Sequence, residues 1–355
     1  MVRYLACLGV LAATPALAYG QASADTKAPE AKSLEAKALF ATDAPLHLVI
    51  DAPLRSIARG ARDRTVAHAG TLSDGAVTLP VRIAPRGLTR RKHETCDFPP
   101  LRVTFDQKPP ATSVFVKQKS LKLVTHCKSA SHFQRHTLLE YAVYRLYNVL
   151  SPASFRARLA YIDYRDNGQP FASRVGFFIE DIDDVAKRNG MKEVNGGPRL
   201  PLQSVDRTAA TRVALFQYMI SNLDWSISAG PAGDNCCHNM KPISLTGAPV
   251  AYVPVPYDFD YSGLVNAPYA VLPNGFPNGP VTRRIYRGYC AHNGEALAAA
   301  ALLRAQMSPM LAAFASVPGL EAGSKAKAAN YLRSFFDQIG TDEAVNDRVL
   351  KRCLR

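Results

Sequence analysis

The chain has 355 residues, of which 47% are hydrophobic and 20% are charged. This composition excludes a globally disordered protein and is sufficient for one large domain or for two lobes. The formal net charge of +14 suits anionic partners such as nucleotides, phosphorylated or acidic proteins, or an anionic surface. Because no zinc-finger pattern or aromatic–basic repeat accompanies the charge, we do not expect a nucleic-acid partner.

The N-terminus has the pattern of a secretory signal peptide over residues 1–18. Arg3 is followed by an apolar run over residues 4–14, and Ala16 and Ala18 form a small-x-small cleavage site. We therefore expect a periplasmic or secreted protein. Residues 19–44 are rich in Ala, Lys and Glu and are expected to form a flexible linker. No later stretch has the length and apolarity expected of a transmembrane segment.

Six cysteines follow the predicted cleavage site, and an even number in an exported protein indicates three disulfides. They are Cys96, Cys127, Cys236, Cys237, Cys290 and Cys353. The adjacent Cys236 and Cys237 are expected to pair with Cys290 and Cys353 rather than with each other, since a bond between neighbours is strained. Cys96 is then left for Cys127. A metal site is the rival interpretation, but the chain has no CxxC motif.

The first half of the chain is rich in predicted strands. Short apolar or alternating runs at 47–51, 77–83 and 101–105 are typical of strands, and residues 84–94 between them form a basic loop. Residues 113–126 are expected to form paired strands, with Lys122 on the face opposite Leu121 and Leu123. The apolar spacing predicts an amphipathic helix over 133–150, and residues 156–165 and 174–179 predict a hairpin.

The second half of the chain is mainly helical by its patterning. Helices are predicted at 183–189, 209–222, 296–315 and 325–339. The predicted fold is therefore α+β with two lobes, stabilised by disulfides. Residues 45–182 would form a β-rich N-lobe with one long helix, and residues 183–355 a mainly helical C-lobe that carries the catalytic loops.

Polar residues gather in the stretch 221–263, around a strand predicted at 251–257. Asp224, Asp234 and Asn239 precede the apolar run, and Asp258 and Asp260 follow it. An Asp, then an Asn, then an Asp at a strand end can hold a metal–nucleotide complex. One acid orients or deprotonates an acceptor hydroxyl, while the amide and the later acid bind Mg²⁺ through oxygen.

The segments HFQRHTLLEYAVYRLYNVLSPASFRARLAYIDY, FFIEDIDDVAKR, NLDW, HNM and YDFD, in this order, resemble the CotH kinase-like family of spore-coat and secreted proteins. The resemblance covers roughly residues 114–262 and implies a fold related to protein kinases. It also implies that Asp224 is the catalytic-loop acid and that Asn239 and Asp258 bind Mg²⁺. The chain departs from a kinase loop in spacing, because Asn239 follows Asp224 by 15 residues. Asp234, five residues before Asn239, is the alternative base. Asp260 is a further candidate metal ligand.

Three residues are candidates for nucleotide binding. Lys122 would hold phosphates, braced by Glu140 of the long helix; Lys117 and Lys119 compete with it for this role. Glu180 ends a strand at the expected hinge, where backbone groups would meet an adenine, although its side chain could simply cap the next helix. No GxGxxG motif is present to cradle the phosphates.

The predicted activity is the transfer of a phosphoryl group from ATP, with Mg²⁺ or Mn²⁺, to Ser or Thr hydroxyls of an exported protein. The alternative is a catalytically inactive kinase-like scaffold that binds an envelope or surface partner, which the irregular Asp–Asn spacing favours. A weaker alternative is an exported hydrolase or polysaccharide-binding protein. Common hydrolase chemistry is not supported, since GxSxG, HExxH and SxxK motifs do not occur.

Overall fold

The computed structural model describes Met1 and residues 36–355. Residues 36–355 belong to a compact unit spanning 33–355. Apart from Met1, the predicted signal peptide lies outside the described residues. So does most of the predicted linker. The end of that linker differs from the prediction, because a 3₁₀ helix at Ala38–Phe40 buries Leu39 and Phe40 against the first lobe.

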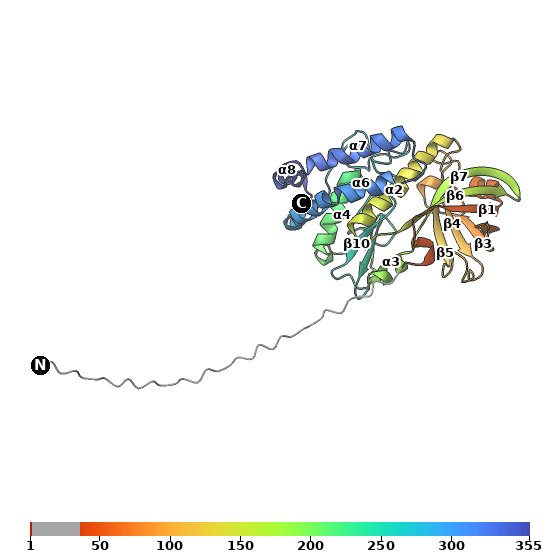
Figure 1. The fold of residues 1–355 in the computed structure, drawn as a ribbon, viewed down its shortest axis with the longest axis horizontal. Coiled ribbons are helices and arrows are strands. Elements are labelled where there is room, and N and C mark those ends of the chain that lie inside the picture. Colours follow the sequence, from red (N-terminus) through yellow and green to blue (C-terminus); the bar gives the residue numbers. More distant parts are fainter. Residues whose placement is uncertain (2–35) are drawn as a thin grey trace. The chain divides into compact units, whose positions relative to one another are not determined.

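The first lobe is a closed β-barrel with the strand order β1-β2-β3-β4-β5-β7-β6. Its strands are β1 (Leu46–Ala52), β2 (His68–Ser73), β3 (Thr78–Pro85), β4 (Leu101–Phe105), β5 (Ser120–Val124), β6 (Ala157–Asp166) and β7 (Gln169–Ile179). Neighbouring strands are antiparallel except β1 and β6, which pair in parallel and close the barrel. A short helix, α1 (Leu54–Gly60), follows β1. Figure 1 shows the strands gathered on one side of the molecule.

The barrel is filled by the apolar residues that alternate along its strands. Leu121 and Leu123 of β5 point into this core together with Ile50, Val81 and Phe178. Lys122 lies between the two leucines and is only partly buried, which confirms its predicted place on the opposite face. The predicted strand at 113–119 is absent, because these residues form successive turns that bury Phe115.

The long predicted helix is α2 (Gln134–Leu150). The sequence indicates an amphipathic helix, but the structure buries it on almost every side because it packs against β7 and against α6 of the second lobe. Its apolar side chains belong to the larger core, which is separate from the interior of the barrel. The helix therefore joins the two lobes, and its residues can reach groups of both.

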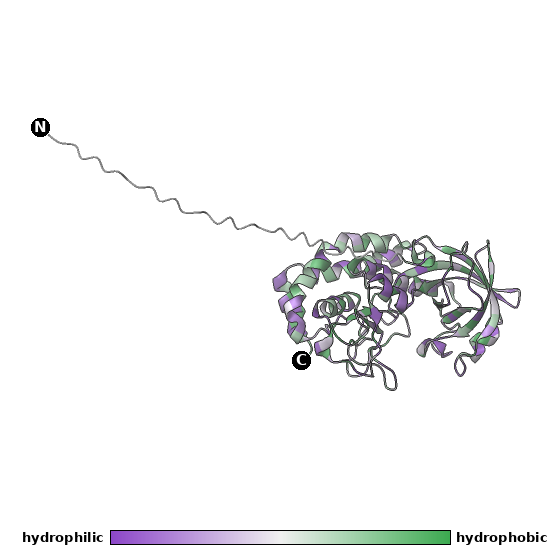
Figure 2. Ribbon diagram, turned by 90° about the horizontal axis from the view of Figure 1, so that it is seen from below, coloured by the Kyte–Doolittle hydropathy of each residue, from purple (hydrophilic) through white to green (hydrophobic). Residues whose placement is uncertain are grey.

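The second lobe is mainly helical and carries one small sheet of order β10-β9-β8. Its helices are α3 (Ile182–Arg188), α4 (Arg207–Ile220), α5 (Ala296–Ala305), α6 (Met307–Ala315), α7 (Ala322–Gln338) and α8 (Asp342–Arg348). The sheet consists of β8 (Lys192–Glu193), β9 (Met240–Ser244) and β10 (Val253–Pro256). Hydrophobic and hydrophilic residues both occur along the helices (Figure 2), as expected for helices that bury one face. The α+β class and the β-rich, then helical order are those predicted.

The helix predicted at 296–315 is broken in two at Gln306. Within residues 36–355 no single helix has the length and apolarity to cross a membrane. One bent pair, residues 290–305 and 307–315 at an angle of 51°, meets those criteria when taken together. Its two helices place Ala300, Leu303 and Phe314 in the core of the lobe.

The disulfide pairing differs in part from the prediction. Cys96 bonds Cys127 as expected, and Cys290 bonds Cys353, but Cys236 and Cys237 bond each other. Cys236 and Cys237 lie away from Cys290 and Cys353, because both of their sulfurs pack on the carbonyl of Ile227. Cys290 instead meets the C-terminus, where its amide donates to the carbonyl of Leu354 at 2.8 Å.

Candidate functional site

A cavity of about 580 Å³ brings together the polar residues that the sequence analysis singled out in the second lobe. It is lined by Asp224, Asp234, Asn239, Asp258 and Asp260, and on the barrel side by residues 86–90, Pro100 and Val124. A larger cavity of about 910 Å³ lies elsewhere, beside the C-terminus of α2 and residues 151–157. It contains none of the predicted site residues, so the smaller cavity is the candidate site.

The loop after α4 positions Asp224. The helix ends where Ser221 takes a left-handed conformation with φ of 53°, and the Asn222 side chain then accepts a hydrogen bond from the Asp224 amide at 3.0 Å. Trp225 returns a hydrogen bond from Nε1 to the Asn222 carbonyl at 3.0 Å, and Arg287 donates to the carbonyl of Trp225 at 2.8 Å. The NLDW motif is thus a rigid turn that presents one carboxylate to the cavity.

Asp224 and Asn239 are in direct contact despite their separation in sequence. The Asn239 Nδ2 donates to the Asp224 carbonyl at 2.7 Å and to its Oδ2 at 2.9 Å. Ser226 and His238 pair through their backbones and close the intervening segment into a side loop. The long spacing between Asp224 and Asn239 therefore does not prevent their direct contact. Asp234 is exposed on this loop at the rim of the cavity, which favours Asp224 as the acid of the site.

His238 is a site residue that the sequence analysis did not assign. Its Nε2 lies 2.7 Å from Asp224 Oδ1, and this hydrogen bond raises the pKa of His238 above its ordinary value. The two Asp224 oxygens thus each have a fixed partner, His238 on one and Asn239 on the other. The only sequence signal for His238 was its position directly before Asn239. Because two cysteines precede it, that position indicated a packing residue.

Asp258 and Asp260 follow β10 but occupy different environments. Asp258 has a φ of 61°, its amide donates to the Tyr144 hydroxyl at 3.0 Å, and its side chain is only partly buried in the cavity. Asp260 is 5% exposed and accepts a hydrogen bond from the Tyr269 hydroxyl at 3.0 Å. Burial and the charge of Asp258 raise the pKa of Asp260. Asp258 is therefore the better placed of the two to meet a ligand.

The oxygen atoms around Asn239 and Asp258 fit a hard divalent cation. Asn239 uses its Nδ2 in the contact with Asp224, so its Oδ1 is left as an oxygen ligand, and the Asp258 carboxylate lines the same cavity. Among residues 36–355 no three Asp, Glu, His or Cys side chains are gathered as a metal site. Mg²⁺ commonly takes only one or two protein carboxylates and completes its octahedron with phosphates and water, so this donor set suits it.

The expected pair of Lys122 and Glu140 does not form. Glu140 is 1% exposed and lies 3.3 Å from Nη1 of Arg90, a residue of the loop between β3 and β4. Arg90 also donates from Nη2 to the Thr125 carbonyl at 2.9 Å. Thr125 follows the end of β5 directly, whereas Lys122 lies within the strand and so further along the barrel. The basic stretch 84–94 was the signal for Arg90, but its pattern indicated only a loop.

Lys122 is not one of the residues that line the cavity, but its Nζ lies 5.6 Å from the ring centre of Tyr257, which is. Burial, followed by the positive charge of Arg86, lowers the pKa of Lys122 to about 8. The lysine forms no ion pair with the described carboxylates. Its role as a phosphate ligand therefore remains a prediction, while its predicted bracing by Glu140 is wrong.

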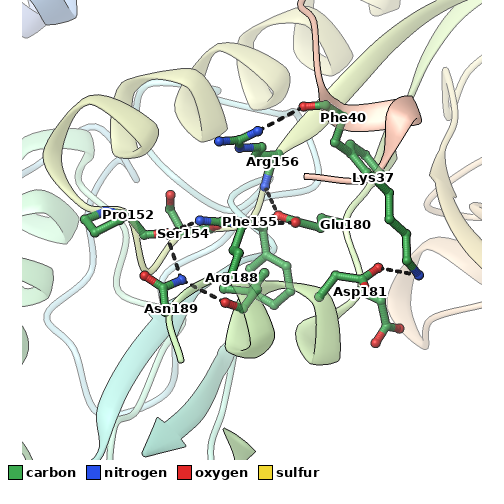
Figure 3. A network of polar contacts seen from close by, with 12 residues as sticks. Lys37, Phe40, Pro152, Ser154, Phe155, Arg156, Glu180, Asp181, Arg188 and Asn189 are labelled. Atoms are coloured by element: carbon green, nitrogen blue, oxygen red, sulfur yellow. Dashed lines mark hydrogen bonds and ion pairs between the residues drawn. The ribbon is translucent and has the colours of Figure 1, made fainter. Parts of the chain in front are cut away.

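Glu180 stabilises the connection between β7 and α3 and does not line the candidate cavity (Figure 3). It is 1% exposed, and its carboxylate accepts from the Arg156 amide at 3.0 Å and from Arg188 Nε at 3.2 Å. Arg188 also donates to the carbonyls of Pro152 and Ser154. The Glu180 amide donates to the Arg156 carbonyl at 2.9 Å, so it is not free for an adenine. The expected helix cap is supplied by Asp181, which accepts from the Asp183 amide.

Comparisons with known proteins give only weak structural similarity. No family model matches the chain, and no curated protein matches it. A solved structure described as the Helicobacter pylori proinflammatory kinase CtkA is similar to 70% of this chain and 92% of its own, with 9% identity and a TM-score of 0.39. The resemblance to the CotH family accordingly rests on the sequence motifs alone.

Proposed function

We propose that this protein is an exported phosphotransferase that uses Mg²⁺–ATP to phosphorylate a Ser or Thr hydroxyl of a protein. The supporting observation is the convergence of Asp224, Asn239 and Asp258 on one cavity, with Asn239 hydrogen-bonded to Asp224. These three residues lie far apart in sequence. Together they would supply the acid, the amide and the second acid that kinase-type phosphoryl transfer uses.

In this proposal Asp224 orients the acceptor hydroxyl and accepts its proton. His238 and Asn239 fix the carboxylate from both sides, so the Asp224 oxygens keep a set orientation before the substrate arrives. Asn239 and Asp258 would hold Mg²⁺, which supplies charge neutralisation on the phosphate oxygens when it is bound. Most of the catalytic effect would come from positioning and charge rather than from covalent chemistry.

The alternative of an inactive kinase-like scaffold is favoured by one observation. Glu140 is engaged by Arg90 and not by a lysine of the strand, so the usual ion pair of an active kinase is replaced. An inactive protein would keep the fold and the hinge but bind no metal–nucleotide complex.

Calorimetric titration of Mg²⁺–ATP into the oxidised mature protein tests the proposal. We expect saturable binding by the wild type that weakens at least ~10-fold in Asp258→Ala, comparable to other losses around metal sites. Asp63→Ala serves as the control, because Asp63 is an exposed acid of the first lobe between α1 and β2. If the folded wild type binds ATP with neither Mg²⁺ nor Mn²⁺, the phosphotransferase proposal is wrong and the inactive scaffold is the remaining interpretation.

A transfer assay then separates the two candidate bases. With a mixture of exported proteins as acceptors, Asp224→Asn should retain ATP binding and lose incorporation of labelled phosphate. Asp234→Asn should keep both, since Asp234 is exposed at the rim and the Asn239 amide is hydrogen-bonded to Asp224. The reverse result would assign the base to Asp234.

A further inference from the structure

The loop between β3 and β4 forms most of the barrel side of the candidate cavity. Residues 86–90 all line it, whereas the strands themselves contribute only Val124. The loop carries two arginines that face the cavity, Arg86 and Arg90, with Gly87 in a left-handed conformation (φ of 81°) directly after the first. The sequence offers no glycine-rich phosphate motif, so a different element must supply the phosphate contacts if this cavity binds a nucleotide.

Arg90 anchors the loop and is not free to bind a ligand strongly. It is 8% exposed, and its Nη1 lies 3.3 Å from Glu140 Oε2 and 3.9 Å from Asp260 Oδ2. These carboxylates come from α2 and from the segment after β10, so one guanidinium joins the loop to both. A buried charge of this kind requires its partners, and it therefore fixes the end of the loop in one position.

Arg86 is held differently. Its amide donates to the Pro100 carbonyl at 2.8 Å, which fixes its backbone, but its guanidinium forms no ion pair with a carboxylate of residues 36–355. The side chain is partly buried and lines the cavity. Its positive charge contributes to the lowered pKa of Lys122. Lys241, also in the cavity wall, is neutralised by Glu193 at 3.0 Å.

The cavity therefore has two walls of opposite charge. Arg86 lines the barrel side without a carboxylate partner, and Asp224 and Asp258 line the other side. Lys122 is not among the lining residues, but its Nζ lies 5.6 Å from the ring centre of Tyr257, which is. An anion with several oxygens would supply the partner that the Arg86 guanidinium lacks, and a divalent metal would join the same anion to the acidic wall. A guanidinium suits this contact, because its planar fork matches phosphate oxygens.

We propose that the loop of residues 86–90 is the phosphate-binding element of the cavity, with Arg86 as its direct contact to a polyphosphate and Arg90 as the residue that fixes it. This inference rests on the proposed function in that the polyphosphate is taken to belong to a nucleoside triphosphate. The phosphate contact itself can be measured without the nucleoside.

The experiment titrates three probes into the full mature protein: Mg²⁺–ATP, adenosine, and inorganic tripolyphosphate without metal. The variants are Arg86→Ala, Arg86→Lys and the control Arg62→Ala, which removes an exposed arginine of the same lobe. We expect Arg86→Ala to weaken both ATP and tripolyphosphate about 10- to 100-fold, as for loss of a charged hydrogen bond. Adenosine affinity should be unchanged, and Arg86→Lys should recover part of the loss.

The outcomes separate this inference from the proposed function. If the wild type binds ATP and Arg86→Ala binds it as well as Arg62→Ala does, the nucleotide site stands and the phosphate role of Arg86 is wrong. If the wild type binds tripolyphosphate but neither ATP nor adenosine, and Arg86→Ala loses that binding, the phosphate site stands while the kinase proposal fails. A wild type that binds none of the three probes overturns both.

Discussion

Lys122 is a partly buried cation whose surroundings are mostly basic. Arg86, Lys241 and Arg102 lie near it, Asp181 is the nearby acid, and no carboxylate forms an ion pair with it in the described part of the chain. Burial and these charges lower its pKa to about 8, so the folded protein holds the lysine in its charged form only below that pH. A bound anion would favour the charged form.

The pH dependence of nucleotide binding follows from this pKa. Because the folded-state pKa is lowered below the ordinary 10.5, the charge is present below about pH 8 and is lost as the pH rises. We expect the affinity for Mg²⁺–ATP to fall between about pH 7 and pH 9 in the wild type. Lys122→Met should bind more weakly at pH 7 and show a flatter profile. Tyr257, with its pKa raised to about 12 by burial, does not titrate there.

Parallel profiles in the wild type and in Lys122→Met would exclude Lys122 as the source of the pH dependence. Calorimetry at each pH provides the affinities, and circular dichroism confirms that both proteins stay folded. Lys117→Met is a matched control, since Lys117 was one of the competing lysines and lies in the turns before β5.

The segment between α4 and β9 shows how two residues with a long spacing in sequence come into direct contact. The NLDW turn is fixed by Asn222 and Arg287, and Asn239 immediately precedes β9. Backbone pairing of Ser226 with His238 gathers the intervening residues into a loop that carries Asp234 and the bonded Cys236 and Cys237. The spacing along the sequence is therefore irregular, while the contact in space is direct.

The Cys290–Cys353 disulfide ties the C-terminal segment to the 3₁₀ helix before α5. It closes a loop with a sequence separation of 63 residues, so its removal releases considerable entropy in the unfolded chain. We expect Cys290→Ser/Cys353→Ser to lower the free energy of unfolding by about 4 kcal/mol. Urea denaturation followed by fluorescence measures this value, with Cys96→Ser/Cys127→Ser, which opens a shorter loop, for comparison.

An unchanged urea midpoint in the Cys290→Ser/Cys353→Ser protein would contradict the pairing. Mass mapping of the oxidised protein after proteolysis gives an independent check. It should yield peptides linked through Cys290 and Cys353, and none that link either of them to Cys236 or Cys237.

The two lobes are joined by α2 and by the ion pairs that it makes. Arg90 comes from the barrel, Glu140 from α2, and Asp260 from the second lobe, and all three are nearly inaccessible to solvent. Burial, with the charge of Asp260, raises the pKa of Glu140, so the carboxylates depend on the guanidinium for stabilisation. The geometry of the candidate cavity therefore depends on Arg90 of the β3–β4 loop.

Removal of Arg90 should destabilise the whole molecule. We expect Arg90→Met to lower the free energy of unfolding by about 3–5 kcal/mol, because two buried carboxylates lose their cation. Lys351→Met is the control, since its ion pair with Asp347 is exposed and should contribute less than about 1 kcal/mol. Equal urea midpoints for the two variants would show that the buried cluster does not hold the lobes.

The sequence by itself determined the features that depend on neighbouring residues. The order of strands and helices and the polar stretch around Asp258 follow from local periodicity and turn chemistry. So does the face on which Lys122 lies. These patterns also identified Asp224, Asn239 and Asp258, which the structure brings into one cavity.

Only the tertiary structure decided the features that depend on distant pairing. The parallel pairing of β1 with β6, which closes the barrel, joins strands separated by most of the lobe. The choice of Arg90 over Lys122 as the partner of Glu140 has the same origin, and so do the pairing of the cysteines and the hydrogen bond from His238 to Asp224. Each depends on which groups lie close together once the chain has packed. Composition and sequence spacing do not determine the distances between groups that are remote in sequence.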